Sequence, residues 1–165
     1  MGRVELLDGA LVVSPVPAVA HQRLVRNLAR SRRQLHEGFA FDGLNVRVGR
    51  DRTMVADIVV LNKPGLDAVI IEPDPVALVV EVACPSDAWV DRLVKPEAYA
   101  RAGIPTFLRV DRDHTDAALD ANNYSLTPEE FVSARAVEGR LVIDKPIPAD
   151  LDLAALATAT RYPGP

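Results

Sequence analysis

The chain has little of what marks secreted, disulfide-stabilised or membrane-spanning proteins. Its 165 residues include a single cysteine, so no disulfide can form within the chain and a reducing compartment is favoured. No apolar run approaches the roughly 20 residues that span a bilayer, and the first residues lack the apolar core of a signal peptide. Repeats and low-complexity segments are also missing. We therefore expect a cytoplasmic protein with no membrane partner.

An excess of positive charge is missing as well. The net charge of -4 argues against a protein that coats nucleic acid non-specifically, although it leaves room for a local basic groove. With 48% hydrophobic and 25% charged residues, the composition is that of an ordinary globular protein. A chain of this length fits a single domain over residues 1–165 and can bury a core.

Two apolar stretches each carry one acid. Residues 76–83, bounded by prolines, are aliphatic except for Glu81 and predict a strand that is buried on both faces. Residues 54–61 have the same character and contain Asp57. Burying an unpaired carboxylate costs several kcal/mol, so each acid should be neutral, paired with a cation or bound to a metal ion. One acid in each of two buried strands suggests that the two acids converge.

A lysine follows the second strand. Pro96 cannot sit inside a straight helix without a cost of about 3 kcal/mol, so a helix in this segment should kink or restart there. Lys95 then lies at the break, from which its amine could reach Glu81 and Asp57. The alternative is a surface lysine paired with Asp91, one turn earlier. An Asp, a Glu and a Lys in this order could hold a hard divalent cation and steady an attacking water.

These residues resemble a known family. The chain is similar to the Uma-type restriction endonucleases of the PD-(D/E)xK nuclease superfamily. The resemblance rests on Ala56-Asp57-Ile-Val-Val, on Leu78-Val-Val-Glu81-Val-Ala-Cys-Pro-Ser86, on Asp91-Arg-Leu-Val-Lys95 with Tyr99, and on Ala102-Gly103-Ile-Pro105 leading to Val110-Asp111. It implies an α/β fold with a restriction-endonuclease-like core, in which a mixed central sheet is flanked by helices, with an N-terminal β-hairpin and short C-terminal strands.

The resemblance also implies a chemistry. It indicates a Mg²⁺- or Mn²⁺-dependent endonuclease that hydrolyses DNA, with Asp57, Glu81 and the backbone carbonyl of Val82 as metal ligands and Lys95 holding the water or the developing charge. A homodimer is expected, because nucleases of this class commonly pair to cut both strands. Alanine stands at position 56 where the superfamily name has proline, and also at position 83 where the simplest E-x-K spelling has lysine. The family pattern displaces the lysine to the position of Lys95.

The N-terminal region offers two further candidates. Residues 4–14 predict a hairpin around Asp8-Gly9, and Glu5 in its first strand is either an extra acid near the metal or an exposed strand residue. A helix is expected over about 18–37, with His21 on its inward face. The resemblance suggests that His21 contacts a metal-bound water or a phosphate, and the alternative is a packed residue.

Two more features of these helices are ambiguous. A basic stripe beside the apolar face of the first helix could contact a phosphate backbone, or could be a solvated face with local ion pairs; its members are Arg23, Arg26, Arg30 and Arg33. Tyr99, one turn after Lys95, could orient that lysine or simply pack.

The rest of the chain predicts a core strand over 104–110, parallel to 76–83 through a right-handed crossover. A loop is expected from Asp111 to Ala121, followed by short strands around 123–126, 131–137 and 141–143. A last helix is expected around 151–159.

Two other functions compete with a nuclease. The first is a catalytically silent module that keeps the nuclease fold for binding or regulation. The second is a thiol hydrolase that uses Cys84 with His21 or His114. The second is disfavoured because Cys84 lies at the end of a buried strand with no cationic neighbour in sequence, and free cysteines are usually inert core residues.

Overall fold

The structure is a computed structural model that describes residues 2–30, 39–63, 67–83, 93–112, 119–126, 131–136, 138–144 and 148–160. The chain begins with the predicted hairpin, formed by β1 (Arg3–Leu7) and β2 (Ala10–Ser14). Asp8 and Gly9 join the two strands with φ angles of 52° and 81°. Two consecutive positive φ angles are what a tight hairpin turn requires, which explains the Asp-Gly pair.

Three helices and nine further strands follow within the described residues. They are α1 (Val19–Arg30), β3 (Ala40–Gly49), β4 (Arg52–Leu61), β5 (Ile70–Ile71), β6 (Val76–Ala83), α3 (Lys95–Arg101), β7 (Thr106–Arg112), β8 (Leu119–Leu126), β9 (Phe131–Arg135), β10 (Arg140–Ile143), β11 (Ala149–Asp152) and α4 (Leu153–Thr160).

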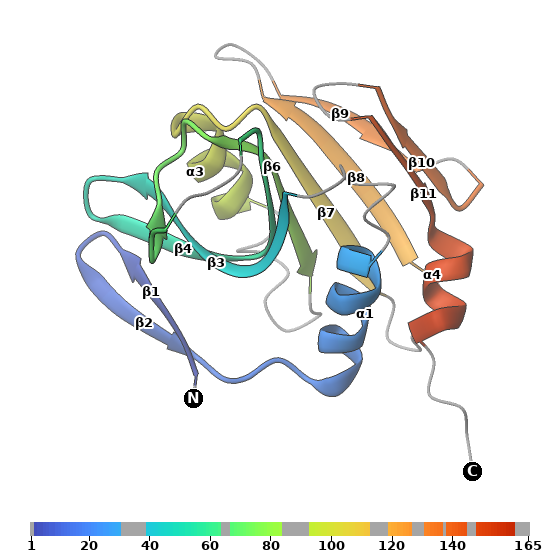
Figure 1. Ribbon diagram of the computed structural model, residues 1–165, viewed down its shortest axis with the longest axis horizontal. Coiled ribbons are helices and arrows are strands. Elements are labelled where there is room, and N and C mark those ends of the chain that lie inside the picture. Colours follow the sequence, from blue (N-terminus) through green and yellow to red (C-terminus); the bar gives the residue numbers. More distant parts are fainter. Residues whose placement is uncertain are drawn as a thin grey trace.

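Nine of the strands form one mixed sheet (Figure 1). Its main path runs β2-β1-β4-β6-β7-β8-β9, while β3 pairs with β4 and β5. Strands β6 and β7 are parallel, as the crossover predicts, and the other neighbours along the main path are antiparallel. The expected mixed sheet with flanking helices and an N-terminal hairpin is therefore confirmed.

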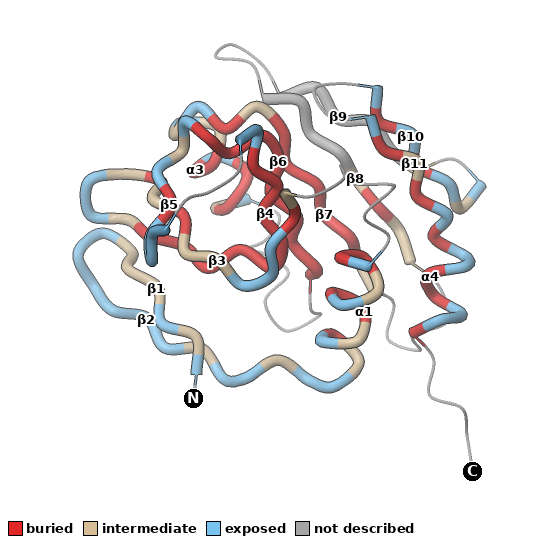
Figure 2. Tube along the Cα trace, viewed as in Figure 1, coloured by how far each residue is buried: buried red, intermediate tan, exposed pale blue. Residues whose placement is uncertain are grey.

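Strand β6 lies in the centre of the core, and all eight of its residues are buried (Figure 2). Its alternate side chains enter two different hydrophobic clusters. Leu78, Val80 and Val82 pack in the cluster that contains residues of α1 and α4, whereas Val79 between them packs in the cluster that contains α3. Because side chains two residues apart on a strand share a face, Glu81 points from β6 to the α3 side together with Val79.

The sheet forks at β4. Strands β1 and β6 both pair with β4, β1 at Thr53 and β6 from Ile58 onward. Ala56 packs on the α3 side, but Ile58 packs on the α1 side, so β4 changes face between them, at Asp57. Strand β3 bends at the matching place, where Gly43 has a φ of 67°. The acid predicted in the first buried strand thus lies where two neighbouring strands separate.

In the second half of the chain, the expected loop over 111–121 and the expected last helix differ in their bounds from the structure. The loop expected over 111–121 is shorter, because β7 continues to Arg112 and β8 begins at Leu119, and the two residues pair in register. Backbone pairing along this hairpin outweighs the low strand propensity of its acidic residues. The first two residues of the expected last helix belong to β11, which pairs with β10, so α4 begins at Leu153. Residues 31–37 of the expected first helix lie outside the described residues.

Candidate active site

Asp57 is held from three directions at the fork. Its side chain is 1% exposed. Oδ2 accepts a hydrogen bond of 2.8 Å from the backbone N–H of Val82 and lies 3.2 Å from Nε2 of His21. Oδ1 contacts the guanidinium of Arg3 from β1. The acid is therefore paired, as its burial requires.

These contacts keep Asp57 ionised. Burial by itself would raise the pKa of the carboxyl, but the hydrogen bond and charge of His21, the charge of Arg3 and the Val82 N–H together outweigh burial and lower the pKa from 3.8 to about 2. A carboxylate that stays charged at neutral pH in a buried place is suited to bind a cation.

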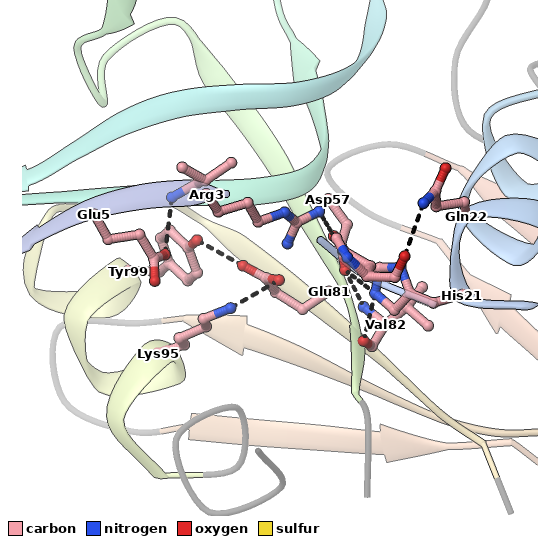
Figure 3. Close-up of polar contacts among 11 residues, drawn as sticks. Arg3, Glu5, His21, Gln22, Asp57, Glu81, Val82, Lys95 and Tyr99 are labelled. Atoms are coloured by element: carbon pink, nitrogen blue, oxygen red, sulfur yellow. Dashed lines mark hydrogen bonds and ion pairs between the residues drawn. The ribbon is translucent and has the colours of Figure 1, made fainter. Parts of the chain in front are cut away.

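Glu81 has its own pair of partners, both from α3 (Figure 3). Nζ of Lys95 lies 3.0 Å from Oε2, and the hydroxyl of Tyr99 donates a 2.9 Å hydrogen bond to Oε1. Burial, and then the neighbouring Glu81 carboxylate, raise the pKa of Tyr99 well above its ordinary value. The phenol consequently stays protonated and acts as a donor to Glu81.

The local sequence of α3 explains how these two partners are aimed. The helix begins at Lys95 and has Pro96 in its first turn, as expected, while residues 84–92 before it lie outside the described residues. A proline is tolerated there because the first N–H groups of a helix have no intrahelical acceptor. Tyr99 follows one turn later and stacks on Phe107 of β7, with 5.6 Å between ring centroids. Asp91, the alternative partner of Lys95, lies outside the described residues.

Glu5 has a structural role at the same fork. Its Oε1 accepts a 3.0 Å hydrogen bond from the backbone N–H of Val55, in the part of β4 that faces the gap between β1 and β6. Asp57 does the same for the N–H of Val82. The two carboxylates thus satisfy backbone donors at the place where the strands separate. Because Glu5 accepts this hydrogen bond, it is not simply an exposed strand residue. A contact between Glu5 and a metal ion remains a prediction.

His21 is buried on the inward face of α1, as predicted, with 3% exposure. Its Nε2 lies 3.1 Å from the carbonyl oxygen of Val82 and 3.2 Å from Oδ2 of Asp57. Both of these atoms are acceptors, so Nε2 carries a proton. Within the part of the chain that the structure describes, the buried Nδ1 finds no hydrogen-bond partner. His21 therefore ties α1 to the end of β6, next to the carbonyl that was expected to serve as a third metal ligand.

Arg3 is the residue of this site that the sequence did not reveal. Burial alone would lower its pKa, but the carboxylates of Asp57, Glu81 and Glu5 raise the pKa of the guanidinium above its ordinary value. The signal in the sequence was a charge imbalance, because two buried acids followed by one lysine need a further cation. The position of Arg3 in an edge hairpin, 54 residues before Asp57, gave no indication that it supplies the missing charge.

The donor groups at the fork suit a hard divalent ion. Asp57 and Glu81 directly flank the pair of Ile58 with Val80 that ends the pairing of β4 with β6, and the main-chain carbonyl of Val82 is a further oxygen. Carboxylate and carbonyl oxygens are the ligands that Mg²⁺ and Mn²⁺ accept. The described residues contain no cluster of three His, Cys, Asp or Glu side chains in metal-binding geometry. The two acids would therefore need the main-chain oxygen, or water, to complete the shell.

The other candidates belong to α1 or lie outside the described residues. Arg26 and Arg30 are on the exposed side of α1, and Arg23 is half-buried, so part of the basic stripe faces solvent. Arg33, Cys84 and His114 lie outside the described residues.

The chain is similar to known proteins in sequence and in fold. A family model described as "Uma2: Putative restriction endonuclease" matches residues 1–150. The chain belongs to the Uma2 family. The match spans the whole Asp57, Glu81 and Lys95 segment, so the resemblance to this family is confirmed.

A solved structure is also similar to this Uma2 chain. It is described as a putative nuclease belonging to DUF820 from Anabaena variabilis, with 18% sequence identity and a TM-score of 0.63, and the similarity covers 93% of this chain and 90% of that chain. At this identity the similarity concerns the fold. No curated protein matches the chain. Among the described residues, no helix has the length and apolar character needed to cross a membrane.

Proposed function

We propose that this Uma2 protein is a Mg²⁺- or Mn²⁺-dependent endonuclease that hydrolyses phosphodiester bonds in DNA. One observation carries the proposal: two buried acids come from adjacent strands at a fork in the sheet, where Asp57 accepts a hydrogen bond from the residue after Glu81 and Lys95 is 3.0 Å from Glu81. Carboxylate and main-chain carbonyl oxygens gathered at one place are the ligands that a hard divalent ion accepts, which supports a metal site at the fork.

The residues have distinct roles in this proposal. Asp57, Glu81 and the carbonyl of Val82 would hold the ion, which when bound lowers the pKa of its water and offsets charge on the scissile phosphate. Lys95 is a compact cation with three donors, so it can hold an attacking water or a phosphate oxygen beside Glu81. Tyr99 fixes the second oxygen of Glu81 and thereby the direction in which this carboxylate points.

Other parts of the proposal concern partners. The exposed Arg26 and Arg30 of α1, with Arg23 beside them, are proposed contacts for the phosphate backbone, and their substitution by Gln should weaken DNA binding and reduce its salt dependence. A homodimer and a cytoplasmic location remain predictions, and the oligomeric state is measurable by analytical ultracentrifugation.

The direct test is cleavage of supercoiled and linear DNA by the purified protein. Cleavage should require Mg²⁺ or Mn²⁺, stop with EDTA, and fall by at least about 100-fold in D57N, E81Q and K95M. R101Q is a matched control, because Arg101 pairs with Glu97 on the solvent side of the same helix. Equal cleavage by wild type and D57N would remove Asp57 from the mechanism and the proposal with it.

A catalytically silent module is the second candidate. It is favoured by one observation, which is that Arg3 and Lys95 already neutralise Asp57 and Glu81 without any ion. A ligand that binds only the folded state raises the melting temperature. If Mn²⁺ raises the melting temperature of the wild type but not of D57N, the metal site exists; if it raises neither, the silent module is the better description.

A further inference from the structure

The two carboxylate oxygens of Asp57 have different kinds of partner. The Oδ2 atom is engaged by groups of the central core, the N–H of Val82 and the ring of His21. The Oδ1 atom contacts Arg3, which comes from the peripheral hairpin. An ion that binds Asp57 without disturbing the core would therefore approach the oxygen that the guanidinium holds.

The guanidinium can leave this place without unfolding the hairpin. The side chain of Arg3 is 27% exposed, compared with 1% for Asp57. The backbone of the hairpin is attached elsewhere: Leu6 pairs with Thr53, and Asp8 accepts two hydrogen bonds from Arg52. A change in the side-chain torsions of Arg3 is therefore sufficient to release Asp57.

The charges at the fork favour an exchange. The guanidinium is attracted by Asp57, Glu81 and Glu5 together, so it serves as a counter-cation when no metal is bound. An ion with two positive charges at the same carboxylates would repel it, since like charges a few ångströms apart interact strongly in a partly buried site. The displaced guanidinium remains at the exposed rim of the site, and its planar fork of donors matches the oxygens of a phosphate group.

We propose that Arg3 and the divalent ion are alternative occupants of Asp57, and that metal binding transfers the Arg3 guanidinium from Asp57 to a phosphate group of the substrate. This inference rests on the proposed metal-dependent function, and it adds a phosphate-binding residue from the N-terminal hairpin to that site. It also assigns Arg3 two states, a counter-cation without metal and a substrate contact with metal.

Calorimetric titration with Mn²⁺ tests the first half of the exchange. Removing the competing charge in R3Q should tighten Mn²⁺ binding by about tenfold, which corresponds to one ordinary charge interaction. R3K keeps a cation near Asp57 and should stay close to the wild type. R52Q is the matched control, because Arg52 of β4 also forms an Arg-Asp pair with the hairpin: its Nη2 lies 2.8 Å from Oδ2 of Asp8. The loss of this pair should leave the Mn²⁺ affinity unchanged. Far-UV circular dichroism of each variant confirms that it is folded.

Binding of a fluorescent DNA duplex tests the second half, with Ca²⁺ in place of the catalytic ion so that the duplex stays intact. With Ca²⁺ present, R3Q should bind the duplex about tenfold more weakly than the wild type. The slope of log K against log salt concentration should be smaller by about 1, as for the loss of one phosphate contact. Without metal, R3Q should bind no more weakly than the wild type, because Arg3 is then held by Asp57.

The outcomes separate this inference from the proposed function. If the wild type binds no Mn²⁺, both fail. If the wild type binds Mn²⁺ and D57N does not, but R3Q binds Mn²⁺ no more tightly than the wild type, the function stands and the exchange is overturned. If R3Q binds Mn²⁺ more tightly but DNA equally well with Ca²⁺, the transfer to phosphate is overturned.

Discussion

Lys95 Nζ lies 3.0 Å from Glu81 Oε2, and both side chains are almost completely buried, with 10% and 2% exposure. This pair joins the first residue of α3 to the central strand β6. A buried charge that loses its partner is costly, because neither water nor another group replaces the lost interaction. The pair therefore links the stability of the fold to the candidate site.

The K95M variant should lose stability as well as activity. It leaves Glu81 buried with Tyr99 as a remaining donor, and we expect the free energy of unfolding to fall by about 3 kcal/mol. The double variant E81Q/K95M should recover part of this loss, since it also removes the buried carboxylate charge that Lys95 balances. Urea denaturation measures both values. R101Q, which breaks the exposed pair with Glu97, should cost at most about 0.5 kcal/mol. An equally small loss for K95M would show that the buried pair does not stabilise the fold.

A second prediction isolates the hydroxyl of Tyr99. The Y99F variant keeps the ring that stacks on Phe107 and removes the donor to Glu81. A hydrogen bond to a charged group contributes about 1.5–3 kcal/mol, so the free energy of unfolding should fall by that amount.

Thr106 provides the control for this prediction. Its Oγ1 is buried, and within the described residues it has no hydrogen-bond partner. T106V removes a buried hydroxyl of this kind and should be neutral or slightly stabilising. If Y99F and T106V have the same effect in urea denaturation, the contact between Tyr99 and Glu81 contributes nothing to stability.

The sequence predicted the two buried acids because each interrupts an aliphatic strand, and the pattern of burial is a local property. It predicted that Lys95 lies at a helix break because Pro96 restricts the backbone in a known way. It did not predict Arg3, whose contact with Asp57 depends on how β1 and β6 share β4. Strand β11 was also missed, since its pairing with β10 overrides the helical composition of the segment that begins at Leu151. Local rules identified the acids, and long-range pairing determined their partners.

A third prediction concerns the dependence of stability on pH. The pKa of Asp57 is lowered to about 2 in the folded protein, compared with about 3.9 in an unfolded chain. A lowered folded-state pKa gives stability that is fully present above the unfolded value and is lost as the pH falls through the folded value. Asp57 should therefore contribute about 2–3 kcal/mol at pH 6, and most of this should be lost by pH 2.

Comparison with D57N tests this contribution. In EDTA, the difference in the free energy of unfolding between the wild type and D57N should shrink by about 2 kcal/mol between pH 6 and pH 2. Because the amide that D57N introduces does not titrate, the change reports the carboxyl group itself. A difference that is independent of pH would mean that Asp57 has an ordinary pKa and that Arg3 and His21 do not act on it as described.

The last prediction concerns the bend that puts Asp57 at the fork. Gly43 in β3 has a φ of 67°, and Gly9 in the hairpin turn has a φ of 81°; at both positions a Cβ atom would meet nothing within 4 Å. An alanine at either position is therefore strained by its backbone alone, and G43A and G9A should each lose about 1–2 kcal/mol. The β3 residues on either side of Gly43 pair with the β4 residues on either side of Asp57, so only G43A should shift this carboxylate. We expect G43A to weaken Mn²⁺ binding by about tenfold, whereas G9A leaves it unchanged in the same titration. If G43A and G9A lose the same stability and bind Mn²⁺ with the same affinity, the bend in β3 does not position Asp57.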